Sequence, residues 1–122
     1  MGAVPGRSTR SLDVMPKDRL AKYELHDAQI GRMVIDHSKA SITIDITYYP
    51  TPDSPKRKGA VLVFDGVEAL SHVASVSGLL INAAAGNISY WEPSSKRGTT
   101  FIHLATGTIA INAKSLAVKE RA

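Results

Sequence analysis

Histidine and acidic side chains are the groups in this chain that could do acid/base chemistry. His26 stands directly before Asp27, and an imidazole with a neighbouring carboxylate can act as a general acid or base. Adjacent residues in an extended segment point to opposite faces, so the two side chains would meet only at a turn. An enzyme would also need His103 to converge with this pair in a pocket. We favour a structural pair that fixes the entry of the chain into its first strand.

Metal and nucleophile chemistry find little support in the spacing of the candidate residues. His26, His72 and His103 could be gathered on one sheet, but their separations match no zinc-binding pattern. The chain has no cysteine, so thiolate ligands and disulfides are both excluded. No serine lies in a Gly-x-Ser-x-Gly or Ser-x-x-Lys motif. We therefore predict a protein without catalytic activity, metal or cofactor.

Two pairs of consecutive aromatic residues suggest recognition instead of catalysis. Tyr48-Tyr49 and Tyr90-Trp91 each end a predicted strand and are followed closely by a proline. Because side chains alternate along a strand, one ring of each pair can enter the core while the other faces outward. Outward Tyr and Trp are frequent interface anchors, although such rings can also simply cover a sheet edge. The candidate partner-binding residues are Tyr49, Tyr90, Trp91 and Glu92.

Positive charge is concentrated at the start of the chain and in one loop. Residues 1–22 hold five cations and two acids, which accounts for +3 of the net charge of +4. A second basic run, 56–58, lies in a proline-rich loop, and we interpret both segments as solvated, with 1–22 a flexible basic leader. Alternatively, both could hold nucleic acid through phosphate contacts if they shared one face with a stacking Tyr or Trp. The residues for that alternative are Arg7, Arg10, Lys56, Arg57 and Lys58.

The elements that would position these side chains are mostly strands. With 122 residues, of which 43% are hydrophobic, the chain can bury one core, so we predict a single β-rich domain at 23–122. Residues 41–49 alternate isoleucine with polar residues, which is typical of a half-buried antiparallel strand. The full set of predicted strands is 29–35, 41–49, 59–64, 67–74, 88–92, 100–105, 108–113 and 116–118.

The last hairpin allows a register to be predicted. The Thr-Gly pair at 106–107 separates two β-favouring runs, and a two-residue connection with glycine favours a tight turn. That turn would pair Leu104 with Ile109 and Ile102 with Ile111, which makes one face wholly aliphatic and the other mixed. We therefore expect these four side chains to be buried together.

One segment departs from the strand pattern. Apolar residues recur at helical spacing between 75 and 85, Ser75 can cap the start, and Gly86 can end the helix. The expected fold class is therefore α+β, a mainly antiparallel sheet of about six to eight strands with one short helix packed on it. No apolar run approaches the roughly 20 residues of a membrane-spanning helix, and the start resembles no secretory signal. A cytoplasmic protein is expected.

Four short motifs in these elements resemble one kind of small bacterial domain. They are E-L-H-D-A-x-I at 24–30, L-V-F-D-G-V-x-x-L at 62–70, G-N-I-S-x-W at 86–91 and G-T-I-A-I-N-A-x-S-L-x-V at 107–118. Together they are similar to proteins of the immunity protein fifty type, and to neighbouring families of unknown function, over roughly 24–118. The motifs are turn and core signatures and contain no catalytic residue.

The resemblance implies a role in binding another protein. Immunity proteins neutralise a cognate bacterial toxin in a stoichiometric complex, so the implied partner is such a toxin. One departure is the charge, because proteins that neutralise basic nuclease toxins tend to be acidic and this domain is not. We predict a non-catalytic protein-binding module, with nucleic-acid binding or a small His/Asp enzyme as alternatives. No membrane partner is expected, and an unpaired sheet edge would allow a homo-oligomer.

Overall fold

Eight β-strands make up the structure of this protein, a computed structural model that describes residues 20, 22–73 and 88–121. The strands are β1 (Gln29–Asp36), β2 (Ser41–Tyr48), β3 (Lys58–Asp65), β4 (Ala69–Val73), β5 (Ile88–Glu92), β6 (Gly98–Leu104), β7 (Gly107–Ala113) and β8 (Ser115–Glu120). Each expected strand is present, with bounds within two residues of the predicted ones. All their pairings are antiparallel, which confirms that part of the prediction. Among the described residues, no helix is long and apolar enough to cross a membrane.

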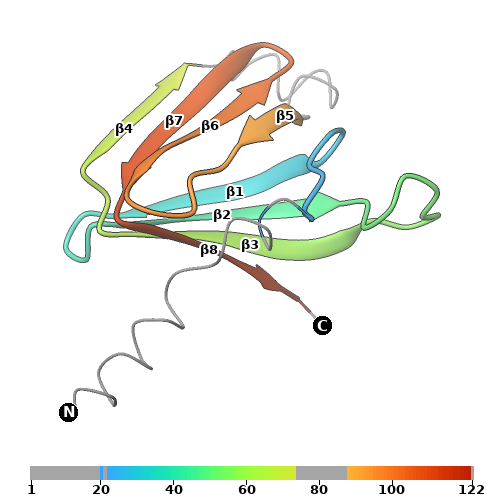
Figure 1. Cartoon of the computed structure of the whole chain (residues 1–122), viewed down its shortest axis with the longest axis horizontal. Coiled ribbons are helices and arrows are strands. Elements are labelled where there is room, and N and C mark those ends of the chain that lie inside the picture. The colour runs from blue at the N-terminus through green and yellow to red at the C-terminus, as the bar shows by residue number, and fades with distance from the viewer. Residues whose placement is uncertain (1–19, 21, 74–87, 122) are drawn as a thin grey trace.

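The strands form two four-stranded sheets, not the single sheet expected. The first sheet has the order β1-β2-β3-β8 and the second β4-β7-β6-β5, and Figure 1 shows them facing each other. A strand with one apolar face needs a second layer to bury that face, and here each sheet supplies the layer for the other. The helix predicted at 75–85 lies outside the described residues. Only the antiparallel part of the expected α+β class is therefore confirmed.

The two sheets are joined at one end, where the chain crosses between them twice. Gly66 and Val67 lead from β3 toward β4, and Lys114 leads from β7 into β8. The Lys114 amide donates to the carbonyls of Asp65 and Gly66 at 3.0 and 3.1 Å, which ties the two crossings together. Gly66 has φ +63°, and a Cβ there would lie 2.7–2.9 Å from side-chain carbons of Lys114. Only glycine fits this corner without strain. From it the sheets diverge toward the opposite end (Figure 1).

The core lies between the inner faces of the two sheets. In β2, Ile42, Ile44 and Ile46 are buried while the residues between them are only partly buried, as the alternation predicts. Leu62 and Phe64 of β3 are buried beside them. The second sheet contributes the four side chains expected to be buried together, Ile102, Leu104, Ile109 and Ile111. The prediction of a shared aliphatic face is confirmed.

The segment ahead of β1 belongs to the same core. Leu20, Tyr23, Leu25 and Ala28 are all buried, and the Tyr23 ring packs edge-on against Tyr48 with ring centroids 5.7 Å apart. In Figure 1 this segment, in blue, lies at the end where the sheets are apart. The packed domain therefore includes Leu20, which stands three residues before the predicted start at 23.

The β6–β7 hairpin has a different register from the predicted one. Leu104 pairs with Gly107 and Ile102 with Ile109, so the turn residues are 105–106 and each predicted pair is wrong by two positions. Neither turn residue has a positive φ, which excludes the primed turns common in two-residue hairpins. Glycine as the fourth residue is typical of a type I turn. A shift of two residues keeps every side chain on its face, so the burial prediction holds although the pairing is wrong.

Candidate interaction surface

The outer face of the second sheet carries exposed aromatic side chains. The alternation that buries Ile102 turns its neighbours Phe101 and His103 outward, and Tyr90 of β5 pairs with His103 on the same side. Tyr90 is 54% exposed and Phe101 39% exposed. Single exposed apolar side chains are common on protein surfaces, but exposed apolar side chains that cluster mark interaction sites. This face is therefore the candidate interaction surface.

Three rings form a stacked row on this face, which we call the aromatic row (Tyr90, His103 and Phe101). The Tyr90 and His103 ring centroids are 4.2 Å apart with planes inclined by 21°. Phe101 follows at 6.2 Å from His103 with planes inclined by 15°. Near-parallel rings at such spacing favour each other's position. The row therefore presents pre-positioned rings to solvent.

A carboxylate lies beside the aromatic row. Oε1 of Glu92 accepts a hydrogen bond from Nε2–H of His103 at 3.0 Å, which fixes the imidazole in the stack. Glu92 pairs with Phe101 across β5 and β6, and its side chain is 58% exposed. Among the described residues, Oε2 of Glu92 has no hydrogen-bond partner. The carboxylate is therefore held by one oxygen and open at the other.

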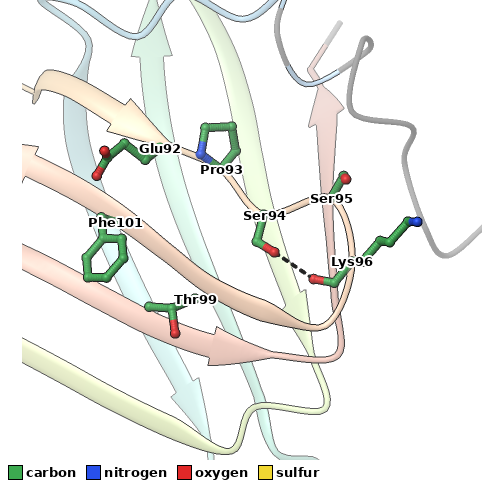
Figure 2. Close-up of a pocket in the computed structure, with 7 residues that line it drawn as sticks. All are labelled: Glu92, Pro93, Ser94, Ser95, Lys96, Thr99 and Phe101. Carbon is green, nitrogen blue, oxygen red and sulfur yellow. Dashed lines mark hydrogen bonds between the residues drawn. The ribbon is translucent and has the colours of Figure 1, made fainter.

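A hollow of about 470 Å³ continues this face at the β5–β6 turn. Ser94 organises the turn, because its amide donates to Oγ1 of Thr100 at 3.0 Å and its hydroxyl to the Lys96 carbonyl at 2.9 Å. Figure 2 shows the Lys96 side chain extending away from Glu92 and Phe101. The hollow is lined by Glu92, Pro93, Ser94, Ser95, Lys96, Thr99 and Phe101. The hollow therefore shares Phe101 with the aromatic row and includes the Glu92 carboxylate beside it.

The two aromatic pairs of the sequence divide as their alternation predicts. Tyr48 is buried, and Trp91 packs against the core while its indole N–H donates to the Tyr23 carbonyl at 3.0 Å. Tyr49 is half-buried, with the Arg57 guanidinium over its ring at 4.7 Å. Of the candidate partner-binding residues, Tyr90 and Glu92 therefore lie on the exposed face, whereas Trp91 and Tyr49 are engaged within the chain.

His26 and Asp27 meet at a turn. Asp27 has φ 67°, a left-handed conformation that brings its Oδ2 within 3.5 Å of His26 Nε2. His26 Nδ1 lies 2.8 Å from the Ser89 carbonyl, and the Asp27 amide donates to the Ile88 carbonyl at 2.8 Å. Both side chains are more than half exposed. The pair thus holds the segment before β1 against the edge of β5.

The histidine candidates do not form one site. His103 makes its contact with Glu92 and with the neighbouring rings, and not with His26 or Asp27. His72 is exposed on the edge strand β4. Within the described part of the chain, no group of three His, Asp or Glu side chains could hold a metal ion.

The basic residues proposed for nucleic-acid binding are mostly engaged elsewhere. Arg57 lies over Tyr49 and donates from Nη2 to the Asp27 carbonyl at 3.3 Å. Lys58 Nζ lies 3.4 Å from Oε1 of Glu120. Lys56 is exposed, with no ion-pair partner among the described residues, and Arg7 and Arg10 lie outside them. Of the 56–58 run, only Lys56 is therefore without a partner among the described residues.

Sequence reasoning missed that Phe101 and His103 belong with Tyr90. The signal was present, since residues two apart in a strand share a face, so Phe101 and His103 had to point the same way. What the sequence did not contain was the pairing of β5 with β6, which sets Tyr90 against His103. The aromatic row depends on that pairing.

Comparisons with known proteins identify no family for this chain. No protein-family model, curated protein or solved structure matches it.

Proposed function

We propose that this protein is a non-catalytic protein-binding module whose contact surface is the outer face of the second sheet. The observation that carries the proposal is the exposure of Tyr90 and Phe101 within one stacked row. Exposed rings that are already held in place lose little conformational freedom on binding, and they bury large areas. Aromatic anchors of this kind dominate the energetics of many protein interfaces.

Charge favours a protein over a nucleic acid at this face. A nucleic-acid surface needs cations near its stacking rings to neutralise phosphates. Here the charged group beside the rings is the carboxylate of Glu92, which would repel a phosphate. The Tyr49 ring, the one nearest the basic loop, is already covered by Arg57.

The partner that we propose is a toxin-like protein, because the motifs resemble immunity proteins. In the structure, several motif residues have core or turn positions. Ala28 and Phe64 are buried, and Gly66 forms the corner between the sheets. Motifs of this kind specify a fold, and the aromatic row lies at positions that they leave unspecified.

Affinity capture with paired variants tests the proposal. The double variant Tyr90→Ser/Phe101→Ser removes the exposed rings, and Val34→Ser, which is 43% exposed on the outer face of the first sheet, serves as the matched control. Immobilised proteins are incubated with lysate of the cells that encode the chain, and retained proteins are quantified by mass spectrometry. We expect one protein to be retained by the parent and the control and to fall about tenfold or more with the double variant.

A second arm addresses the alternatives. The parent is titrated with duplex and single-stranded DNA and RNA at two salt concentrations, where nucleic-acid binding would weaken steeply with salt. If the retained protein is encoded by the adjacent gene, co-expression should relieve its toxicity. Retention that is indifferent to the loss of both rings, or tight salt-sensitive binding to nucleic acid, would contradict the proposal.

A further inference from the structure

We infer that the partner presents an arginine side chain, which stacks on the aromatic row and pairs with Glu92. The inference rests on the proposed function, because it names the chemistry that the same surface would recognise. It is carried by the placement of one carboxylate beside two exposed rings, and by the absence of any other Asp, Glu, Lys or Arg from the strands of this sheet.

The charge on this face differs from the charge of the chain. The protein carries +4 overall, yet Glu92 is the one Asp, Glu, Lys or Arg that points outward from β4, β5, β6 and β7. The remaining outward residues of β4 and β7 are Ala69, Ser71, Val73, Thr108, Ala110 and Asn112. A lone negative charge on the strands of this face complements a single cationic group of the partner.

Glu92 and its three nearest outward neighbours form a square across β5 and β6. Tyr90 faces His103 and Glu92 faces Phe101, so the exposed rings occupy one diagonal and the bonded Glu92–His103 pair the other. A group placed over the square would touch both rings and the open Oε2 of Glu92. His103 acts as a positioning residue here, since its hydrogen bond holds the carboxylate in place.

A guanidinium fits this square better than an ammonium or an apolar side chain. It is planar, stacks on aromatic faces and donates several hydrogen bonds to a carboxylate at once. The protein itself shows both halves of this recognition. Arg57 lies over the Tyr49 ring at 4.7 Å, and Arg97 Nη1 lies 2.6 Å from Oε2 of Glu68. At the square the two halves are combined, and no arginine among the described residues occupies it.

The test is a titration of isotope-labelled protein, followed by NMR, with the peptide acetyl-Gly-Arg-Gly-amide. The same peptide with citrulline replacing arginine keeps the shape of the side chain and removes its charge. We expect weak binding, with shifts concentrated at Tyr90, Glu92, Phe101 and His103, and a weaker response to citrulline. Glu92→Gln should reduce the affinity for the arginine peptide about threefold. Glu68→Gln, which removes an exposed carboxylate already paired with Arg97, should leave it unchanged.

The outcomes separate this inference from the proposed function. If Glu92→Gln and the citrulline exchange both weaken binding, and Glu92→Gln also lowers retention of the captured partner, the arginine is supported. Equal shifts with both peptides, no shift with either, or shifts located away from the aromatic row would overturn it. If retention depends on Tyr90 and Phe101 but not on Glu92, the surface binds protein and the arginine is wrong. If retention ignores the rings as well, the proposed function fails.

Discussion

The outer faces of the two sheets arise from the same alternation of inward and outward residues, but they carry different kinds of side chain. On the first sheet, Asp45 is paired with Arg121 at 2.7 Å and with Arg32 at 3.6 Å, so its charge is neutralised by neighbours on the same face. On the second sheet, Tyr90 and Phe101 stay exposed beside Glu92, which has one open oxygen. On the first face the charge of Asp45 is paired within the chain. On the second face the two rings and one oxygen of Glu92 remain available for contacts with a partner.

This difference shows how a small protein of two packed sheets can use different residues for stability and for recognition. Inner positions are constrained, because each residue there packs against the opposite sheet. Outward positions are free to differ, and the chain uses ion pairs on one face and stacked rings on the other. Substitutions on the inner faces should therefore change folding, and substitutions on the second outer face should change binding.

The largest expected effect tests the difference between the inner and outer sides of β7. Ile109 is buried, so Ile109→Asp places an unpaired charge in the core and should destabilise by several kcal/mol. Ala110 is the next residue and points outward, so Ala110→Asp should change stability by about 1 kcal/mol or less. Urea unfolding of both variants gives the comparison. Equal stabilities would show that the two faces are assigned wrongly.

A second variant asks whether the segment ahead of β1 supports both sheets. Leu20 is fully buried in the shared core, and Leu20→Ala should cost about 3 kcal/mol through lost burial and a residual cavity. The neighbouring Lys22→Ala, at an exposed residue, serves as the control. Thermal unfolding measures the effect. A melting temperature unchanged by Leu20→Ala would support the original domain start at 23.

The inner face of the first sheet ends in a hydrogen bond with a pH signature. The Tyr48 hydroxyl donates to Oε2 of Glu120 at 2.8 Å, and this bond holds the pKa of Glu120 below its usual value. Burial, with the same bond, raises the pKa of Tyr48. Because the pKa of Glu120 is lowered, its contribution is present at neutral pH and is lost as pH falls through the lowered pKa.

Tyr48→Phe should therefore destabilise by about 1 kcal/mol at neutral pH and raise the pKa of Glu120 toward its ordinary value. Stability measured by urea unfolding between neutral and acid pH should fall less steeply in this variant than in the parent. NMR titration of the Glu120 side chain gives the pKa directly. If stability fell equally with decreasing pH in the parent and the variant, the hydrogen bond would not be the cause of the pH dependence of stability.

The smallest expected effect concerns the ion pairs of the first outer face. Asp45→Asn removes the charge that binds Arg32 and Arg121, and should cost about 0.5 kcal/mol, since surface ion pairs contribute little. The loss should shrink further at high salt. Partner retention should be unaffected. A strong loss of binding would move the interaction surface to the first sheet and reverse the comparison.

The strands were predictable because the alternation of apolar residues is strong. Ile42, Ile44 and Ile46 identify β2 and its buried face without any knowledge of its partner. The β6–β7 register was not predictable from a Thr-Gly pair, because Gly107 fits either a primed turn or the last position of a type I turn. The two registers bury the same residues, so the hydrophobic pattern cannot distinguish them.

The site could be predicted only in part. Tyr90 and Glu92 were recognised as a candidate contact from the run of aromatics that ends β5. The sequence could not show whether Tyr90 or Trp91 is the exposed ring. The alternation requires that one of the two enters the core and does not say which. His26 and Asp27 meet through a positive φ at Asp27, a conformation that sequence alone does not specify. The aromatic row itself needs pairing between strands.

Hydroxyl-radical footprinting of the free protein and of its complex with the captured partner tests the central claim most directly. Tyr90 and Phe101 are exposed and aromatic, so both should be oxidised readily in the free protein. In the complex, oxidation of both rings should fall severalfold, while Val34 and Ile35 on the first sheet should be oxidised as before. Unchanged oxidation of Tyr90 and Phe101 in the complex would contradict the assignment of this face as the interaction surface.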